Sequence, residues 1–419
     1  MAFNVFKNTV LFPIIIGFVL MISCANLSKS KTDINDEMLG QAQHDKTDSI
    51  SKSIVVGANQ IETYLPLLNG KRVGVVANQT SVIFNDRSYT HLVDSLMALN
   101  INIKKVFAPE HGFRGTADAG EHVKDDVDTK TNLPLISLHG KNRKPLQQQL
   151  EDLDVIIFDI QDVGVRFYTY ISTLHYVMEA CAEAKIPLII LDRPNPNGHY
   201  IDGPTLKIEN KSFLGMHPIP LVHGMTIGEY AHMINGEKWL ANNQKCDITI
   251  IPIKHYTHDS FYSLPIRPSP NLPNDQSIKL YPSLGLFEGT NVNAGRGTEF
   301  QFQRYGAPFL DKEVLKFNYT PVSNFGAKNP KHKDVVCYGE DLKDENINGI
   351  MTLKWVIKAY KNSTDKSLFF LTSGFTKHAG TDKLQKQIEA GLSEDTIKKT
   401  WHDDLKAFKK IRAKYLIYD

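Results

Sequence analysis

Residues 154–164 of the chain read DVIIFDIQDVG, an apolar run that leads into two aspartates and a glycine. Such a run is typical of a strand buried on both faces, because a strand with one exposed face alternates apolar and polar residues. Similar apolar runs occur at 72–77, 103–107 and 186–191. Helical patterns lie at 91–99 and 174–181. The sequence therefore predicts an α/β fold with a parallel sheet that helices cover on both faces.

Polar residues follow each of these four predicted strands. They are Asn78, Glu110, Asp159 with Asp162, and Asp192 with Arg193. In open parallel sheets the carboxyl ends of the strands meet at one edge, and ligands bind in the crevice there. One polar strand end is what any strand shows on entering a loop, but four of them together predict a binding or catalytic site.

Residues 106–115 read VFAPEHGFRG and place Glu110, His111 and Arg114 directly after an apolar strand. Pro109 stiffens the backbone at this point, while the two glycines allow sharp turning. A glutamate at the mouth of a buried strand is well placed to have its pKa raised and to act as an acid. The alternative is an ordinary turn whose charged side chains are solvated.

The predicted sheet lacks the sequence features of a nucleotide site. Residues 77–81, ANQTS, follow the first strand without a Gly-x-Gly-x-x-Gly fingerprint, and no P-loop occurs. Gly295-Arg296-Gly297 lies much later, outside such a unit. We therefore expect a Rossmann-like sheet with no nucleotide and no other cofactor. The formal net charge is only +2, and we expect no nucleic-acid partner.

The amino terminus predicts export. Lys7 precedes an apolar run at 9–22, and Ser23-Cys24 follows it, as in a secretory signal. Cysteine after a small residue resembles the bacterial lipoprotein signal, which implies that Cys24 is lipidated; the alternative is an ordinary signal peptide with an incidental cysteine. Residues 25–53 are polar and predict a flexible tether. We expect a lipid-anchored protein of the bacterial cell envelope, facing the periplasm or held in the outer membrane.

The length of 419 residues predicts two globular domains. The proline-rich residues 265–273 are a plausible boundary, which gives domains at 54–272 and 273–419. Residues 287–300, FEGTNVNAGRGTEF, carry two glutamates and an arginine on a glycine-rich loop. These side chains suit hydroxyl and carboxylate recognition, although a solvated interdomain loop has a similar composition. Cys181, Cys246 and Cys337 show no disulfide or zinc spacing and are expected to be small buried residues.

Several segments together resemble the exo-β-N-acetylmuramidase (NamZ-type) family of bacterial glycoside hydrolases. They lie at 74–80, 109–115, 119–122, 158–170, 191–196, 288–299 and 380–382. The similarity covers, in order, nearly everything after the tether. It implies a Rossmann-like catalytic domain followed by a smaller α/β C-terminal domain that completes the cleft. The implied activity is the release of N-acetylmuramic acid from the non-reducing end of peptidoglycan fragments in cell-wall turnover.

The residues suit glycoside cleavage, in which one carboxyl group protonates the leaving oxygen and a second often acts as base or nucleophile. Glu110 is the candidate acid, from its motif match and its position at a strand mouth. The second group is left open among Glu121, Asp162, Glu288 and Glu299. The 2-acetamido group of the substrate is a further alternative, as in substrate-assisted glycosidases.

The lactyl carboxylate of muramic acid calls for a cation with fork geometry. The candidates are Arg166, Arg193 and Arg296, at least one of which is expected to be a structural ion-pair partner. Tyr168 could stack on a sugar face or simply pack in the core. His111 could orient Glu110 or bind a hydroxyl. Further substrate-binding candidates from the matching motifs are Asn78, Arg114, Asp192, Asn195 and Glu299.

Two other functions fit parts of the sequence. A metal-dependent deacetylase or amidase could use Asp159, Asp162, Asp192, Glu110 and His111. No His-Glu-x-x-His or comparable cluster occurs, and we expect no metal site. A non-catalytic muropeptide-binding lipoprotein could use the same crevice. The expected partners are peptidoglycan-derived muramyl saccharides and, through the anchor, a membrane; no protein partner is evident.

Overall fold

The computed structural model describes residues 53–86, 88–115, 125–347 and 349–419. The strands are β1 (Val73–Ala77), β2 (Val82–Phe84), β3 (Tyr89–His91), β4 (Ile103–Ala108), β5 (Asp126–Val127), β6 (Pro134–Ser137), β7 (Val155–Asp159), β8 (Leu188–Leu191), β9 (Ile248–Ile251), β10 (Arg304–Ala307), β11 (Phe317–Tyr319) and β12 (Cys337–Asp341). The α-helices are α1 (Ile61–Leu68), α2 (Leu92–Ala98), α3 (Gln147–Leu150), α4 (Tyr170–Ala184), α5 (Ile227–Gly236), α6 (Asp275–Leu284), α7 (Lys354–Lys361), α8 (Thr372–Ala379), α9 (Lys383–Glu389), α10 (Glu394–Lys399) and α11 (His402–Arg412). All four apolar runs of the sequence form strands of one sheet, so that prediction is confirmed.

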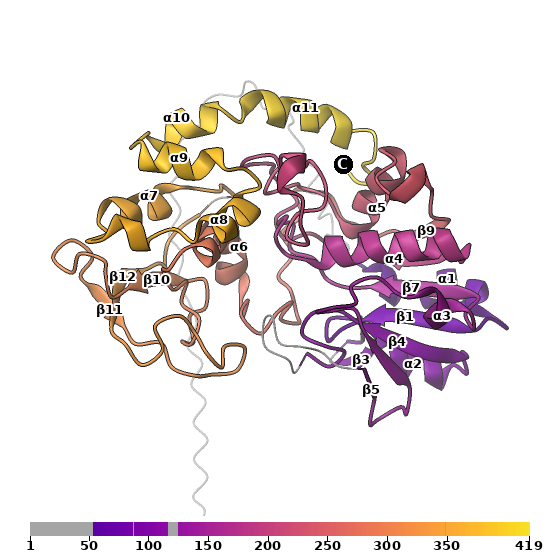
Figure 1. Cartoon of the computed structure of the whole chain (residues 1–419). Helices are drawn as coiled ribbons and strands as arrows, with labels where there is room; N and C mark the ends of the chain where they lie inside the picture. The colour runs from indigo at the N-terminus through magenta and orange to yellow at the C-terminus, as the bar shows by residue number, and fades with distance from the viewer. Residues whose placement is uncertain (1–52, 87, 116–124, 348) are drawn as a thin grey trace, which may run out of the picture. The chain divides into compact units, whose positions relative to one another are not determined.

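The main sheet has the strand order β5-β6-β4-β1-β7-β8-β9 (Figure 1). All neighbouring pairs are parallel except β5 with β6. The chain starts in the middle with β1, moves outward through β4 to β6, and then returns to the other side of β1 with β7. This is the doubly wound Rossmann arrangement, whose ligand crevice lies where the strand order reverses, beside β1.

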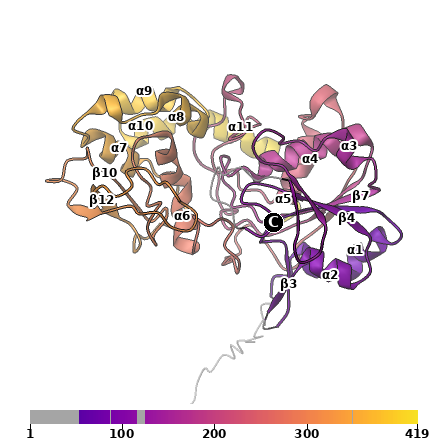
Figure 2. The same cartoon turned by 60° about the horizontal axis from the view of Figure 1, so that its bottom comes forward.

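Helices cover both faces of this sheet, as predicted. The views in Figures 1 and 2 place α1 and α2 on one face and α3 and α4 on the other. Phe107 and Phe158 belong to the core on the α4 side, whereas Val106 and Ile157, one residue earlier on the same strands, belong to the core on the α1 and α2 side. Because side chains alternate along a strand, an entirely apolar strand can fill both cores.

The later part of the chain forms a smaller antiparallel sheet, β10-β12-β11, together with helices α6 to α11. Leu384 and Ile388 of α9 and Phe408 of α11 are buried, so these helices pack into the core. Together with the doubly wound sheet, this confirms the α/β fold with a smaller C-terminal part. The predicted boundary between residues 272 and 273 stays a prediction.

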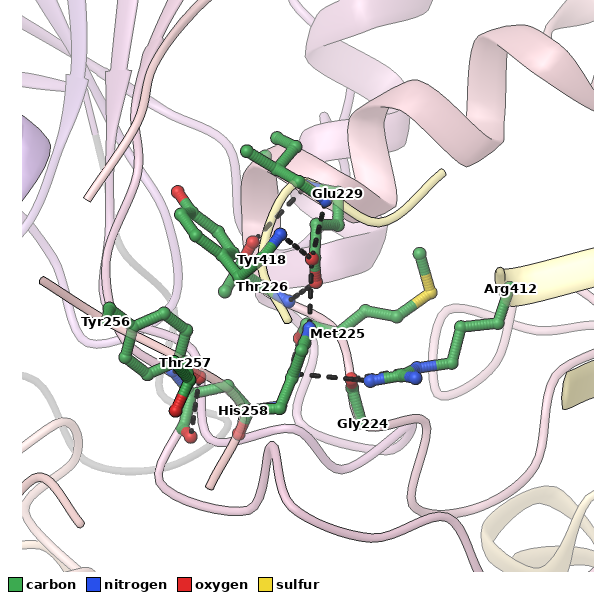
Figure 3. A network of polar contacts seen from close by, with 12 residues as sticks. Gly224, Met225, Thr226, Glu229, Tyr256, Thr257, His258, Arg412 and Tyr418 are labelled. Atoms are coloured by element: carbon green, nitrogen blue, oxygen red, sulfur yellow. Dashed lines mark hydrogen bonds and ion pairs between the residues drawn. The ribbon is translucent and has the colours of Figure 1, made fainter. Parts of the chain in front are cut away.

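The last residues of the chain pack against the main-sheet region (Figure 3). The Glu229 carboxylate, on α5, accepts hydrogen bonds from the backbone N–H groups of Ile417 (2.9 Å) and Tyr418 (3.3 Å). His258 lies 3.0 Å from the same carboxylate. The Tyr418 hydroxyl donates to Asp192, directly after β8, at 2.7 Å. The C-terminal end thereby satisfies two carboxylates that are completely buried.

The predicted signal peptide (1–24) with Cys24 and nearly all of the predicted tether lie outside the described residues. Within the described ranges, no helix is long and apolar enough to cross a membrane. Cys181, Cys246 and Cys337 are buried free thiols, as expected.

Candidate active site

A cavity of about 650 Å³ lies next to the segment that follows β4. Its lining comes from early and late parts of the chain alike: residues 110–111, 167–170, 214, 269, 271–272, 281, 288, 293–294, 296, 302, 326–331 and 378. Four other residues that the sequence predicted for the site line this cavity together with Glu110: His111, Tyr168, Glu288 and Arg296.

Glu110 reaches the cavity because the backbone turns sharply after β4. His111 and Gly112 both adopt left-handed conformations (φ 72° and 76°), and Gly112 N–H donates to the Pro109 carbonyl at 3.0 Å. The half-buried Glu110 carboxyl accepts a hydrogen bond from the Thr169 hydroxyl at 3.0 Å, and its own carbonyl lies 3.4 Å from the Tyr170 hydroxyl. The acid candidate is thus held by the two residues at the start of α4.

A second carboxylate in the cavity, Glu288, is paired with a cation. Arg296 Nε lies 3.1 Å from Glu288 Oε1. Burial opposes ionisation of this carboxyl group, but the charges of Arg296 and Lys331 outweigh burial and lower the pKa of Glu288 to about 2. Glu288 is therefore an ionised carboxylate at neutral pH.

Lys331 is fixed by backbone carbonyls. Its Nζ donates to the carbonyls of Phe287 (2.9 Å), Glu288 (3.2 Å) and Thr290 (2.6 Å). Burial lowers the pKa of Lys331. The ammonium group thus braces the turn that carries Glu288 and supplies a positive charge beside its carboxylate.

The loop that carries Arg296 is held from both sides. Gly295 and Gly297 both have φ 77°, and a Cβ on Gly297 would come within 2.6 Å of Pro330 Cγ and the Val322 carbonyl. Asn293 accepts from Gly295 N–H at 2.7 Å and donates to the Arg296 carbonyl at 3.1 Å. A loop fixed in this way presents its arginine in one orientation, which favours preorganised binding.

Aromatic rings form a further wall of the cavity. Tyr168 packs edge-on against Tyr170 and Tyr281, with ring centroids 4.9 and 6.0 Å apart, and its hydroxyl donates to the Pro268 carbonyl at 2.6 Å. Tyr281 in turn packs against Phe302 at 4.8 Å. The Arg296 guanidinium lies 5.1 Å from the Phe302 ring centroid. Such a wall can hold the apolar face of a sugar ring.

Two sequence-derived family models match nearly all of the folded chain. The model described as Exo-beta-N-acetylmuramidase NamZ, N-terminal, matches residues 73–276, and its C-terminal counterpart matches residues 279–418. The chain belongs to the NamZ family.

Similar proteins agree with this assignment. The peptidoglycan beta-N-acetylmuramidase NamZ of Bacillus subtilis (strain 168) is 40% identical over 381 residues, which are 85% of this chain and 90% of that protein. A solved DUF1343 family protein from Bacteroides fragilis NCTC 9343 is 44% identical, with a TM-score of 0.79 over 88% of this chain and 99% of the other. A second one from the same strain is 28% identical, with a TM-score of 0.72 over 87% and 99%.

In this NamZ family member, other polar strand ends bind each other rather than line the cavity. Arg193 pairs with the Asp159 carboxylate through Nε (2.6 Å) and Nη2 (2.9 Å), and Nη2 also donates to the Val82 carbonyl. Both side chains are almost completely buried. Nε and Nη2 of the guanidinium are thereby bound inside the protein.

Asp192, Asn195 and Asn78 are also buried and organise loops. Asp192 accepts from the Thr226 hydroxyl at 2.7 Å and from Gly228 N–H at 2.9 Å. Asn195 donates to the Met225 carbonyl at 2.9 Å. Asn78 accepts from the Thr80 backbone and hydroxyl at 2.8 and 2.6 Å. None of these three lines the described cavity.

Asp162 and Arg166 are buried and do not line the described cavity. Asp162 accepts from Gly164 N–H at 2.7 Å, and burial raises the pKa of Asp162 to about 7. Arg166 donates to the carbonyls of Pro204 (2.7 Å), Ile219 (2.9 Å) and His378 (3.0 Å), and burial lowers the pKa of Arg166 to about 9. Arg166 thus joins distant backbone segments.

Arg114 and Glu299 also lie outside the described cavity, and Glu121 lies outside the described residues. Arg114 pairs with Asp128 at 2.8 Å and Asp94 at 3.3 Å. Glu299 is exposed. Among the candidates for the second carboxyl group that the structure describes, Glu288 lines the cavity together with Glu110.

The sequence reasoning did not single out Thr169, Asn293, Lys331 or His378, which all line the cavity. Thr169 belongs to the family-like segment 158–170 and follows Tyr168, a candidate substrate-binding residue. That position is the sequence feature that could have pointed to it. Lys331 comes from a distant loop and His378 from the distant helix α8, and neither carries a local sequence pattern. Within 53–86, 88–115, 125–347 and 349–419, no three His, Cys, Asp or Glu side chains are grouped so that they could hold a metal ion.

Proposed function

We propose that this protein is an exo-acting glycosidase that releases N-acetylmuramic acid from the non-reducing end of peptidoglycan fragments. Family membership and the named activity of the Bacillus subtilis relative support this assignment. The observation that carries it in the structure is that Glu110, which accepts from the Thr169 hydroxyl, and Glu288, which is paired with Arg296, line the same cavity. Two carboxyl groups with separate roles are what most glycoside hydrolases use.

Glu110 is the proton donor to the leaving oxygen in this proposal. Glu288 is unsuited to that role, because Arg296 and Lys331 hold its pKa near 2 and it carries no proton at neutral pH. An ionised carboxylate can instead activate a water molecule or attack the anomeric carbon. We assign Glu288 as the second carboxyl group on this basis.

The charge of the cavity suits an anionic sugar. Three cationic residues line it, Arg296, Lys328 and Lys331, against the two glutamates. Arg296 is the proposed ligand of the lactyl carboxylate, since its guanidinium lines the cavity whereas those of Arg166 and Arg193 are bound elsewhere in the interior. The cavity volume of about 650 Å³ lies in the range of small-molecule sites and fits a terminal sugar.

Export and lipid anchoring are part of the proposal and rest on the sequence. The apolar run at 9–22 followed by Ser23-Cys24 supports a lipidated Cys24 in the cell envelope, on a tether at 25–53. Metabolic labelling with a palmitate analogue tests it: label in the wild type and none in Cys24→Ser is expected. Wild-type protein that takes up no label would contradict the proposed lipid anchor.

The activity is tested with purified protein and 4-nitrophenyl β-N-acetylmuraminide. We expect the wild type to turn over this glycoside and an N-acetylmuramyl disaccharide. On the disaccharide, whose leaving group needs protonation, we expect a loss of at least about a hundredfold in Glu110→Gln and unchanged activity in Glu313→Gln, an exposed glutamate outside the cavity lining. If the wild type turned over no muramyl glycoside, the assignment as a muramyl glycosidase would be wrong. Undiminished turnover of the disaccharide by Glu110→Gln removes that residue from the acid role. Loss of activity after exhaustive chelation would favour the metal-dependent alternative.

A further inference from the structure

Thr169 stands at the N-cap of α4 but does not cap the helix. An N-cap threonine ordinarily accepts a hydrogen bond from a backbone N–H in the first helical turn. At α5, Thr226 does so, accepting from Glu229 N–H at 3.3 Å. Thr169 has no such side-chain bond, and its backbone is at φ −74°, ψ 1° rather than extended. Its hydroxyl lies 3.0 Å from Glu110 Oε2 instead.

The position of this hydroxyl is fixed by its surroundings. Thr169 is 7% exposed, and its carbonyl accepts from the N–H groups of Ser172 and Thr173, both at 3.0 Å. The neighbouring hydroxyls of Tyr168 and Tyr170 contact the Pro268 carbonyl and the Glu110 carbonyl. A β-branched side chain has few χ1 choices, so the anchored backbone also fixes the hydroxyl.

We infer that Thr169 is a positioning residue for the proton that Glu110 transfers, an inference that rests on the proposed glycosidase function. The Thr169 hydroxyl donates to Oε2, so the acidic proton of Glu110 is carried on Oε1. The same hydrogen bond orients the carboxyl group and stabilises the carboxylate that forms when the proton leaves. A bond to a charged acceptor is stronger than one to a neutral acceptor, so the stabilisation grows along the reaction.

The step balances as a hydrolysis. The Glu110 proton goes to the glycosidic oxygen while the bond from that oxygen to the anomeric carbon breaks with its electron pair. A water molecule then supplies the hydroxyl group of the released N-acetylmuramic acid, and the remaining proton of that water returns the protein to its starting protonation state.

The test compares two leaving groups. A sugar alcohol is a poor leaving group and needs protonation, whereas 4-nitrophenolate leaves with little help from an acid. For Thr169→Val, which keeps the shape and loses the hydroxyl, we expect kcat on an N-acetylmuramyl disaccharide to fall about tenfold to a hundredfold with KM within about twofold. On the 4-nitrophenyl glycoside we expect a loss below about threefold. Thr169→Ser, which restores the hydroxyl, is expected to retain activity on both.

Thr173→Val is the matched control, because Thr173 lies one turn further along α4 and its hydroxyl contacts the Thr169 carbonyl at 3.4 Å rather than Glu110. It is expected to retain activity on both substrates. Thermal unfolding shows whether each variant is folded, and Thr169→Ala provides a second variant without the hydroxyl.

Equal losses on the two substrates, or a Thr169→Ser variant as impaired as Thr169→Val, overturn the positioning role. Undiminished turnover of the disaccharide by folded Thr169→Val or Thr169→Ala does so as well. The proposed function fails differently, because the wild type is then inactive on both glycosides.

Discussion

Nε of Arg193 lies 2.6 Å from Oδ1 of Asp159, with the two side chains 3% and 0% exposed. The pair joins the ends of neighbouring strands β7 and β8, at the sheet edge where a ligand was expected. Removing one partner of a buried ion pair leaves the other charge uncompensated, which typically costs about 3–5 kcal/mol. The ion pair at these strand ends therefore has a structural role in this protein.

Arg193→Met is expected to lower the free energy of unfolding by about 3–5 kcal/mol in urea denaturation. The exposed pair Arg72–Asp154, with side chains 44% and 33% exposed, offers the control, and Arg72→Met is expected to cost about 1 kcal/mol or less. Similar costs for the two substitutions would show that the Arg193 pair is not what joins the strands.

Asp162→Asn is expected to flatten the pH dependence of stability. Burial raises the pKa of Asp162 from 3.8 to about 7. The folded state then keeps a proton that the unfolded chain releases, so wild-type stability falls as pH rises from about 4 to 7, by at most about 1.4 kcal/mol per pH unit. Asparagine resembles the protonated acid and does not ionise, so the variant does not lose stability in this way as pH rises.

The variant is therefore expected to be more stable than the wild type at pH 8 and similar to it near pH 4, measured by urea denaturation. Asp192 also titrates in this range, because burial raises its pKa to about 6, but it is common to both proteins. Parallel stability curves for the two proteins would contradict the assignment to Asp162.

Arg296→Gln is expected to lower kcat/KM on muramyl glycosides about tenfold to a hundredfold, the value of a lost charge-assisted hydrogen bond. It also leaves the titratable groups of Lys331, His378 and Tyr281 acting on Glu288. With less positive charge to oppose burial, the pKa of Glu288 rises from about 2, and the acid limb of the kcat/KM profile moves to higher pH.

A pH-rate series on the 4-nitrophenyl glycoside measures both effects. Arg304→Gln is the control, because Arg304 pairs with Asp341 outside the described cavity. An acid limb that stays in place in Arg296→Gln would mean that Glu288 ionisation does not govern it.

Gly380→Ala is expected to destabilise the protein far more than Gly391→Ala. Both glycines adopt left-handed conformations, with φ 76° and 75°, so alanine is strained at either by about 1–2 kcal/mol. A Cβ at Gly380 would in addition collide with Nη2 of the buried Arg166, whereas nothing lies within 4 Å of a Cβ at Gly391. Equal melting temperatures for the two variants would show that Arg166 can move aside.

The main sheet was predictable because its strands are apolar throughout and lie in sequence order beside clear helical patterns. Glu110 was locatable for the same reason: a buried strand ends and a proline-glycine turn follows. The sequence did not reveal the hydrogen-bond and ion-pair partners of the other strand-end residues. Asp159 and Arg193 are 34 residues apart, and each on its own resembles a ligand-binding residue. Which polar groups bind each other depends on packing that a single sequence does not display.

Thr169 illustrates the same limit in the cavity. A threonine before a helix is the expected cap, and only the structure shows that its hydroxyl contacts Glu110 instead. Glu288 and Arg296 were predicted from loop composition. The hydrogen bonds from Lys331 to the backbone carbonyls of the turn that carries Glu288 were not, since the lysine belongs to a loop some forty residues further along the chain.

The tail contacts around Glu229 in Figure 3 join residues that are made far apart in time. Tyr418 is synthesised 226 residues after Asp192, whose carboxylate it hydrogen-bonds, and Ile417 and Tyr418 likewise reach back to Glu229. A chain that has emerged only as far as α5 or β9 holds these two carboxylates without their late donors. These two carboxylates therefore gain all of their hydrogen-bond donors only after residues 417 and 418 have been made, and a fragment that ends at residue 276 would lack those donors.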